Sequence, residues 1–278
     1  MNVESASSIP IVCPDDLGAL HSAVAGLQCS LCGRRFPSVE GIVELLPREA
    51  LQETSPENSQ LHNYSASFSN RPDSAWRHSL GVFLNLLGNR YLYSWAVRAL
   101  ERLANDQSFT ILDAACGDGI LRRFLSTRHG YVGIDFSSRP LIRASRYHPA
   151  SYFRADLNHL PFPSSTFDVV LSFQALQYLD RPEVALVEMA RVLKPAGKLF
   201  LTVPNDESFK YRRQGIPRIQ LQRFNRQSLP ALLAPQFEVV HASTRGFWLP
   251  LPMISVHLPG VYRPSWGLSW TVVATPRK

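Results

Sequence analysis

The sequence predicts an α/β fold built on a doubly wound, mostly parallel sheet. Short apolar runs rich in β-branched and aromatic residues alternate with helical patterns from about residue 109 to residue 205. Several of these runs end in an acidic residue, and the first of them, ILDAACGDG at 111–119, continues into glycines. At 278 residues the chain is also long enough for one buried domain of about 200 residues with an appendage.

The run at 111–119 predicts a buried strand that ends in a turn with few side chains. Gly117 and Gly119 let the backbone approach a ligand closely at the carboxyl end of the strand. The residues that follow, Ile120–Arg123, fit neither the G-x-G-x-x-G pattern of dinucleotide sites nor the phosphate-binding P-loop. Asp113 would repel a phosphate and suits a cationic group such as the ammonium of an amino acid. A plain strand–helix connection is the alternative interpretation of this turn alone.

The elements after this turn repeat the same pattern. The run GYVGIDF at 130–136 predicts a second strand that ends in Asp135. This residue lies about 20 residues past the glycines, where nucleoside-binding α/β domains place a carboxylate on the ribose hydroxyls. Phe136 follows and suits packing on an adenine ring. Further strands are expected at 151–156, at 167–173 and before Pro204, with a helix over 182–193 and closing strands near 237–244 and 268–274.

Taken together, the motifs resemble class I S-adenosylmethionine-dependent methyltransferases, in particular the broad group that includes ubiquinone- and menaquinone-biosynthesis and natural-product biosynthesis enzymes. The resemblance is carried by ILDAACGDG, GIDFS, ADLNHLPFPSSTFDVVLSFQALQYL and RVLKPAGKLFLTVPN, between about 109 and 205. It implies a seven-stranded Rossmann-like sheet whose last strand is antiparallel. It also implies S-adenosylmethionine as cofactor and direct displacement at the sulfonium methyl. One departure is Ala115, which stands where the family usually has glycine. Its methyl group is a small intrusion, so cofactor binding is expected to survive, and a weakened cofactor site is the alternative.

The resemblance further implies cofactor-binding roles for ten residues. Their expected partners are the amino group (Asp113), the methionine moiety (Ala115, Gly117, Gly119), the ribose (Asp135), the adenine (Phe136, Asp156, Leu157), and the methionine end beside the acceptor (Phe173, Gln174). No residue is identified as a general base, although His62, Tyr64, His78, His241 and His257 are candidates. Gln174 and Tyr178 suit orienting a substrate better than proton transfer.

The amino-terminal segment predicts a small metal-binding module. Cys29 and Cys32 form a C-x-x-C knuckle, and Cys13 precedes it. The stretch from 13 to 47 resembles the zinc-ribbon module that precedes or partners methyltransferases, except that Asp16 replaces the second cysteine of the first pair. Zinc held by Cys13, Asp16, Cys29 and Cys32 is one interpretation, with His21 as a further candidate ligand. A ribbon that has lost its metal and is held by apolar packing is the other.

Three segments are expected along the chain. Residues 1–50 form the zinc-ribbon-like module, 51–74 a polar linker, and 75–278 the methyltransferase domain, beginning with a helix up to about residue 103. Aromatic residues of that helix, Tyr93 and Trp95 among them, suit either an apolar pocket or the core. Residues 205–230 and 245–266 are expected to be insertions on the acceptor side, the second either an apolar lid, a shallow membrane contact or a packed crossover.

Charge and composition bound the choice of acceptor. The formal net charge is +7, and six basic residues without an acidic one lie between Lys210 and Arg226. This stretch suits an anionic acceptor, a membrane surface or RNA, and equally a solvated face. Methyl transfer to a small or lipophilic metabolite is the main expectation. RNA-base methylation and a catalytically impaired protein that acts through a partner are the alternatives. The absence of an apolar stretch of about 18 residues, of a signal-peptide pattern and of a disulfide framework predicts a cytoplasmic protein.

Overall fold

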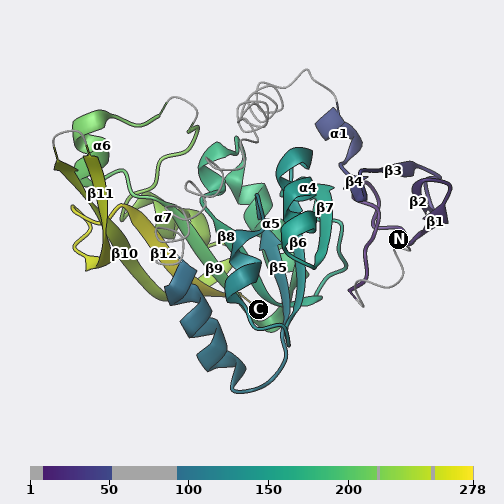
Figure 1. The fold of residues 1–278 in the computed structure, drawn as a ribbon, viewed down its shortest axis with the longest axis horizontal. Helices are drawn as coiled ribbons and strands as arrows, with labels where there is room; N and C mark the ends of the chain where they lie inside the picture. The colour runs from purple at the N-terminus through teal and green to yellow at the C-terminus, as the bar shows by residue number, and fades with distance from the viewer. Residues whose placement is uncertain (1–8, 52–92, 218–219, 252–253, 278) are drawn as a thin grey trace.

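One continuous mixed sheet runs through the described part of the chain. The computed structural model describes residues 9–51, 93–217, 220–251 and 254–277. Within them twelve strands lie in the order β1 (Leu20–Ala23), β2 (Gly26–Cys29), β3 (Arg35–Val39), β4 (Ile42–Leu45), β7 (Ser151–Ala155), β6 (Gly130–Asp135), β5 (Thr110–Ala114), β8 (Phe167–Phe173), β9 (Leu193–Pro204), β12 (Ser269–Pro276), β10 (Phe237–Leu251) and β11 (Ile254–Tyr262) (Figure 1). The expected seven-stranded sheet is therefore only the middle of a larger one, because strands from both ends of the chain extend it.

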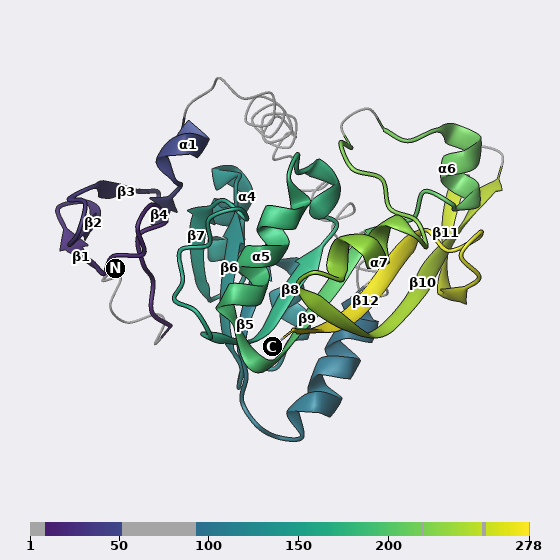
Figure 2. The same cartoon turned by 180° about the vertical axis from the view of Figure 1, so that it is seen from behind.

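The six strands from β4 to β9 in this order are parallel, and β12 pairs antiparallel with β9, as expected for the last strand. Successive residues of the central strands enter cores on opposite faces of the sheet. Ile111 shares one core with the helix over 93–104 and with α4 (Ser138–Tyr147), whereas Leu112 shares the other with α5 (Pro182–Val192) and α7 (Ser228–Leu233). Figure 2 shows α5 and α7 in front of the sheet, on the side opposite to the helix in front in Figure 1. None of the described helices has the length and apolar content of a bilayer crossing.

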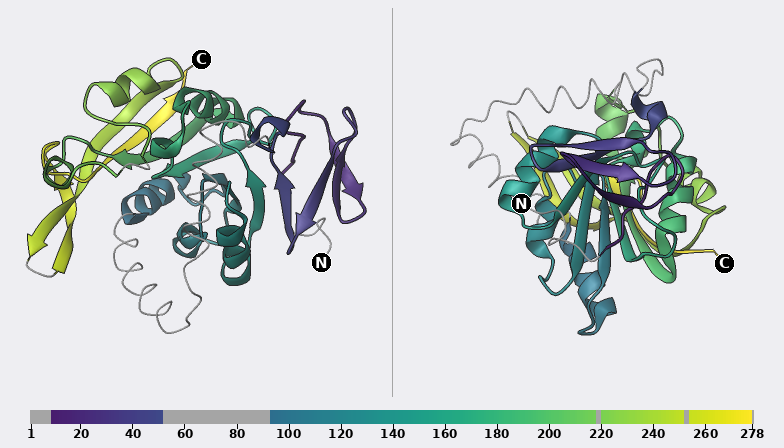
Figure 3. Two further views of the ribbon diagram at one scale, coloured as in Figure 1. Left: turned by 90° about the horizontal axis from the view of Figure 1, so that it is seen from above. Right: turned by 90° about the vertical axis from the view of Figure 1, so that its right-hand side faces the viewer.

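The amino-terminal module is part of the same sheet and core as the central domain. Its strand β4 pairs in parallel with β7, and α1 (Arg48–Leu51) follows directly. Val43 and Leu45 of β4 are buried in the core that also contains Ile134 and Phe153. The module lies at one end of the sheet and the carboxyl-terminal strands at the other (Figure 3). The first residue of the expected linker (51–74), Leu51, ends α1. The rest of the linker and the beginning of the helix after it fall in 52–92, outside the described residues.

The two expected insertions differ in structure. Residues 205–230 contain α6 (Phe209–Gln214) and the start of α7. Residues 245–266 were expected to be an apolar lid, a membrane contact or a packed crossover between two strands. In the structure, β10 and β11 pair as an antiparallel hairpin along most of this stretch, with a register shift between Arg245 and Phe247. Backbone pairing between the two strands satisfies the polar groups that a long apolar loop would leave without partners.

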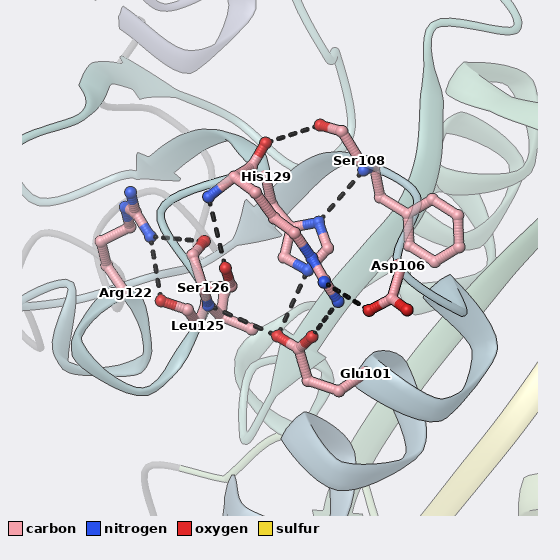
Figure 4. A network of polar contacts seen from close by, with 9 residues as sticks. Glu101, Asp106, Ser108, Arg122, Leu125, Ser126 and His129 are labelled. Carbon is pink, nitrogen blue, oxygen red and sulfur yellow. Dashed lines mark hydrogen bonds and ion pairs between the residues drawn. The ribbon is translucent and has the colours of Figure 1, made fainter.

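A polar network anchors the helix over 93–104 to the sheet (Figure 4). Glu101 accepts hydrogen bonds from the backbone N–H of Ser126 and from Nε2 of His129, and it forms an ion pair with Arg128. Nδ1 of the buried His129 accepts from the N–H of Phe109 at 3.1 Å. The network therefore ties the helix to the loops at the amino ends of β5 and β6, and Tyr93 lies at the other end of this helix.

Candidate functional site

A cavity of about 270 Å³ opens at the carboxyl ends of β5, β6, β7 and β8. This is the edge of a parallel α/β sheet at which ligands bind. Nine of the ten residues expected to hold the cofactor line it: Asp113, Ala115, Gly117, Asp135, Phe136, Asp156, Leu157, Phe173 and Gln174. These residues come from separate sequence motifs, and the structure brings them together around one cavity. The exception is Gly119, which is not among the lining residues.

The turn after β5 has left-handed backbone at three positions, with φ of +73° at Ala115, +53° at Gly117 and +66° at Gly119. An added Cβ at Gly117 would meet nothing within 4 Å, so the backbone there borders open space. A Cβ added at Gly119 would lie 2.8 Å from the Tyr152 hydroxyl, so the packing below the turn requires glycine at this position. Ala115 occupies a conformation that favours glycine, at a cost of roughly 1–2 kcal/mol. The departure from the family pattern is thus a backbone strain as well as an added methyl group.

Asp113 is a buried carboxyl at the floor of the cavity. It is 4 % exposed, and the Tyr131 hydroxyl donates a 2.5 Å hydrogen bond to its Oδ2. The pKa of Asp113 is raised to about 7, mainly by burial. The hydrogen bond from Tyr131 lowers this pKa, and the nearby charge of Asp135 raises it further. A carboxyl with this pKa changes charge near neutral pH, and a cationic ligand group would favour its ionised form.

The carboxylate of Asp135 is held at the end of β6 by two backbone groups. Its Oδ2 accepts from the N–H of Gly117 at 2.9 Å and its Oδ1 from the N–H of Ser137 at 2.8 Å. Burial raises its pKa, and these two hydrogen bonds act in the opposite direction. The glycine turn and the acidic strand end are thus directly linked. Asp156 directly follows β7, and its Oδ1 similarly accepts a hydrogen bond from the N–H of Asn158.

Aromatic residues form the other side of the cavity. Tyr93 and Phe173 stack with ring centroids 5.4 Å apart, and Tyr178 also lines the space. Gln174 has a left-handed φ of +56°, and its side-chain amide donates to Thr202 Oγ1 at 3.2 Å. A non-glycine residue held in this conformation at a cavity wall is typical of functional positions. Trp95, by contrast, is buried in the core against Phe200.

A second cluster of polar side chains lies in the amino-terminal module. Cys13, Asp16, Cys29 and Cys32 each offer a ligand atom, and these atoms all lie within 4.8 Å of one another. His21 does not belong to the cluster. The backbone N–H of Gly18 donates a hydrogen bond to Asp16 Oδ1. The pKa of Asp16 is lowered to about 2, mainly by this hydrogen bond and to a smaller extent by hydrogen bonds from the cysteine thiols. Asp16 is therefore a carboxylate, the form that binds a metal.

Two distances between ligand atoms in this cluster match those of a tetrahedral zinc site. Zn–S bonds of about 2.3 Å place two thiolates about 3.8 Å apart, and a thiolate and a carboxylate oxygen about 3.5 Å apart. The Sγ atoms of Cys13 and Cys32 are 3.8 Å apart, and Cys29 Sγ lies 3.4 Å from Asp16 Oδ1. The N–H of Leu31 also donates to Cys29 Sγ at 3.3 Å, which stabilises a thiolate. Three sulfurs and one oxygen thus form a donor set that zinc accepts.

Several lining residues were not anticipated from the sequence. Asp118, Ser137 and Pro140 border the cavity just after the two strand ends, and Tyr131 acts from below through Asp113. Their position directly after the expected strands is the signal that could have identified the first three. Of the candidate bases, His241 is exposed on β10 and does not line the cavity, and His257 belongs to β11. His62, Tyr64 and His78 lie outside the described residues.

Known proteins match the segment that forms the cavity. Residues 112–201, from β5 to β9, match a family described as a methyltransferase domain. The chain is 33 % identical over 117 residues to a malonyl-[acyl-carrier protein] O-methyltransferase of Enterobacter lignolyticus, covering 41 % of this chain and 47 % of the relative. It is 34 % identical over 113 residues to a 2-phytyl-1,4-naphtoquinone methyltransferase of Thermosynechococcus vestitus, covering 37 % and 50 %. The chain therefore spans about half the length of these curated relatives.

The fold is shared with solved structures. A SAM-dependent methyltransferase of Thermotoga maritima superposes with a TM-score of 0.52 at 21 % identity, covering 72 % of this chain and 96 % of the other. At this identity the likeness shows the fold alone. Residues 112–201 are therefore similar in sequence to a methyltransferase domain, and the chain shares the Rossmann-like fold of that solved structure.

Proposed function

We propose that the chain transfers a methyl group from S-adenosylmethionine to a small or lipophilic metabolite. The observation that carries the proposal is the convergence of Asp113, Asp135, Asp156 and the open backbone of Gly117 on one cavity at the carboxyl edge of the sheet. Acidic groups suit the ammonium and ribose hydroxyls of this cofactor, and they disfavour phosphate. The cofactor would supply an activated, electrophilic methyl group.

The residues of the cavity would bind and orient the cofactor. Asp135, fixed by two backbone N–H groups, would accept hydrogen bonds from the ribose hydroxyls, and Phe136 would flank the adenine. Asp113 would face the amino group, with Tyr131 holding its carboxyl in place. The left-handed turn at Gly117 would bring backbone rather than a side chain against the methionine moiety.

The acceptor would lie beside Tyr93, Phe173 and Tyr178. The stacked pair of Tyr93 and Phe173 offers an apolar wall that excludes water from the reacting atoms. Gln174, tied to Thr202 and Ser269, would present a fixed polar group for orientation. Alignment of the two reactants would be the main contribution of the protein to the rate. The relatives named above as acting on an acyl-carrier-linked acid and on a quinone make carboxyl and quinone compounds the first acceptors to test.

Calorimetric titration with S-adenosylhomocysteine tests the cofactor assignment. The wild-type chain should bind it, and Asp135→Asn should weaken binding about 100-fold, because two hydrogen bonds to a charged group are worth about 1.5 kcal/mol or more each. Asp106→Asn is the matched control, since Asp106 is fully exposed and is not among the residues that line the cavity. Absence of binding by the wild type would refute the proposed activity. Methylation of RNA, with none of the small acceptors modified, would refute the proposed acceptor class.

We also propose that the cluster in the amino-terminal module holds one structural zinc ion. The chain purified without chelators should contain about one zinc per molecule, measured by elemental analysis, and Cys29→Ser should lose it. Cys116→Ser should keep the metal, because Cys116 lies in the turn after β5 and outside the cluster. A wild-type chain that contains no zinc and does not take it up from solution would contradict the assignment.

A further inference from the structure

A row of charged residues crosses the boundary between the amino-terminal module and the cavity. In the register of the parallel strands, Glu44 of β4 lies beside Arg154 of β7, and Arg154 lies beside Asp135 of β6. Residues in register on neighbouring strands project from the same face of the sheet. The row therefore leads from the module, through one arginine, to a strand end at the cavity.

Arg154 connects the module to a cavity wall by three contacts. Its Nη1 donates to Glu44 Oε1 at 2.9 Å, and its Nε donates to the backbone oxygen of Phe136 at 2.9 Å. The guanidinium also lies over the Phe136 ring, 5.7 Å from the centroid. The side chains of Arg154 and Glu44 are only 17 % and 23 % exposed, so water screens this ion pair weakly.

A second element of the module carries a charge that acts on a residue of the cavity. Helix α1 follows β4, and its Ala50 is buried. The pKa of Asp156 is raised mainly by burial and in smaller part by the charge of Glu49 in α1. Besides the contacts of Arg154, the module therefore acts through the charge of Glu49 on Asp156, one of the residues expected to hold the adenine.

We infer that Glu44 is a positioning residue for the cofactor site, acting through Arg154 on Phe136, so that the amino-terminal module sets the affinity for the adenosine half of S-adenosylmethionine. This inference rests on the proposed function. Without the Glu44 carboxylate, the guanidinium keeps its charge but loses the partner that holds it over the ring. Both the carbonyl and the ring of Phe136 then lose the contact that fixes them.

Calorimetric titration of two variants with S-adenosylhomocysteine and with 5′-methylthioadenosine tests the inference. Glu44→Gln and Arg154→Lys should each raise both dissociation constants by about fivefold, the low end of typical couplings between sites. Glu40→Gln is the matched control, since Glu40 of the same module forms a 3.1 Å ion pair with Arg146 that is exposed and away from the cavity. It should leave both constants unchanged.

Urea unfolding midpoints, measured in parallel, identify a variant that is merely less stable. The inference is overturned if both variants bind the two ligands as tightly as the wild type. It is also overturned if only S-adenosylhomocysteine weakens, because the effect would then lie at the methionine end. If the wild type binds neither ligand, it is the proposed function that fails.

Discussion

The protonation of Asp113 should make the stability of the chain depend on pH in a defined window. Burial raises the pKa of this carboxyl from 3.8 to about 7. Because the folded-state pKa lies above the unfolded-state value, the folded chain binds a proton between these pH values that the unfolded chain does not. The contribution to stability is therefore fully present below pH 3.8 and is lost as the pH rises through about 7.

The size of the effect follows from the shift. Each pKa unit corresponds to about 1.4 kcal/mol, so the free energy of unfolding should fall by about 2 kcal/mol between pH 5 and pH 7 from this group alone. Above pH 7 the contribution should level off. The pKa values of Asp135, Asp156 and Asp206 are raised as well, so the curve of the wild type alone does not isolate Asp113.

Asp113→Asn isolates the group because it keeps the shape and removes the titration. Urea unfolding of both chains, without ligand, should be followed by tryptophan fluorescence at pH 5, 6, 7 and 8. Between pH 5 and pH 7, the unfolding free energy of Asp113→Asn should rise by about 2 kcal/mol relative to that of the wild type. Asp106→Asn should run parallel to the wild type. Parallel curves for the wild type and Asp113→Asn would refute a titration of Asp113 in this window.

Three further predictions concern stability and use urea midpoints. Ala115→Gly should stabilise the chain by about 1 kcal/mol, because it relieves a left-handed φ of +73°, and an unchanged midpoint would contradict that strain. Gly119→Ala should destabilise by about 2 kcal/mol or more, since its Cβ would lie 2.8 Å from the Tyr152 hydroxyl. Gly117→Ala has open space and should cost less; equal losses would argue against the packing explanation. Glu101→Gln should cost about 1 kcal/mol and speed amide exchange in the helix over 93–104, whereas unchanged exchange would exclude the anchoring role.

Much of the central fold could be predicted because its signals are local. The strand over 167–173 is found at the expected residues, and the expected helix over 182–193 is α5 (Pro182–Val192). Apolar runs, helical spacing and strand-end acids depend on neighbours within a few positions. The positions of Asp113 and Asp135 at the ends of parallel strands also follow from the pattern, since the carboxyl ends of such strands meet at one edge.

Other features depend on residues far apart in the chain. The hairpin of β10 and β11 was not expected, because an apolar, proline-rich stretch has no clear period to indicate pairing. The resemblance predicts that Gly119 lies under the methionine moiety, and the structure adds that a Cβ at this position would lie 2.8 Å from the Tyr152 hydroxyl. Nothing in the sequence near either residue indicates that contact.

By itself, the sequence determined the α/β class, the acidic and glycine residues of the cavity edge, and the four candidate metal ligands. Each of these depends on spacing within short segments. Only the tertiary structure decided that β4 joins the central sheet beside β7, and that Glu44 therefore meets Arg154, 110 positions further along the chain. Such a contact arises from the burial of apolar faces such as those of Val43 and Leu45 in the common core, which no local pattern specifies.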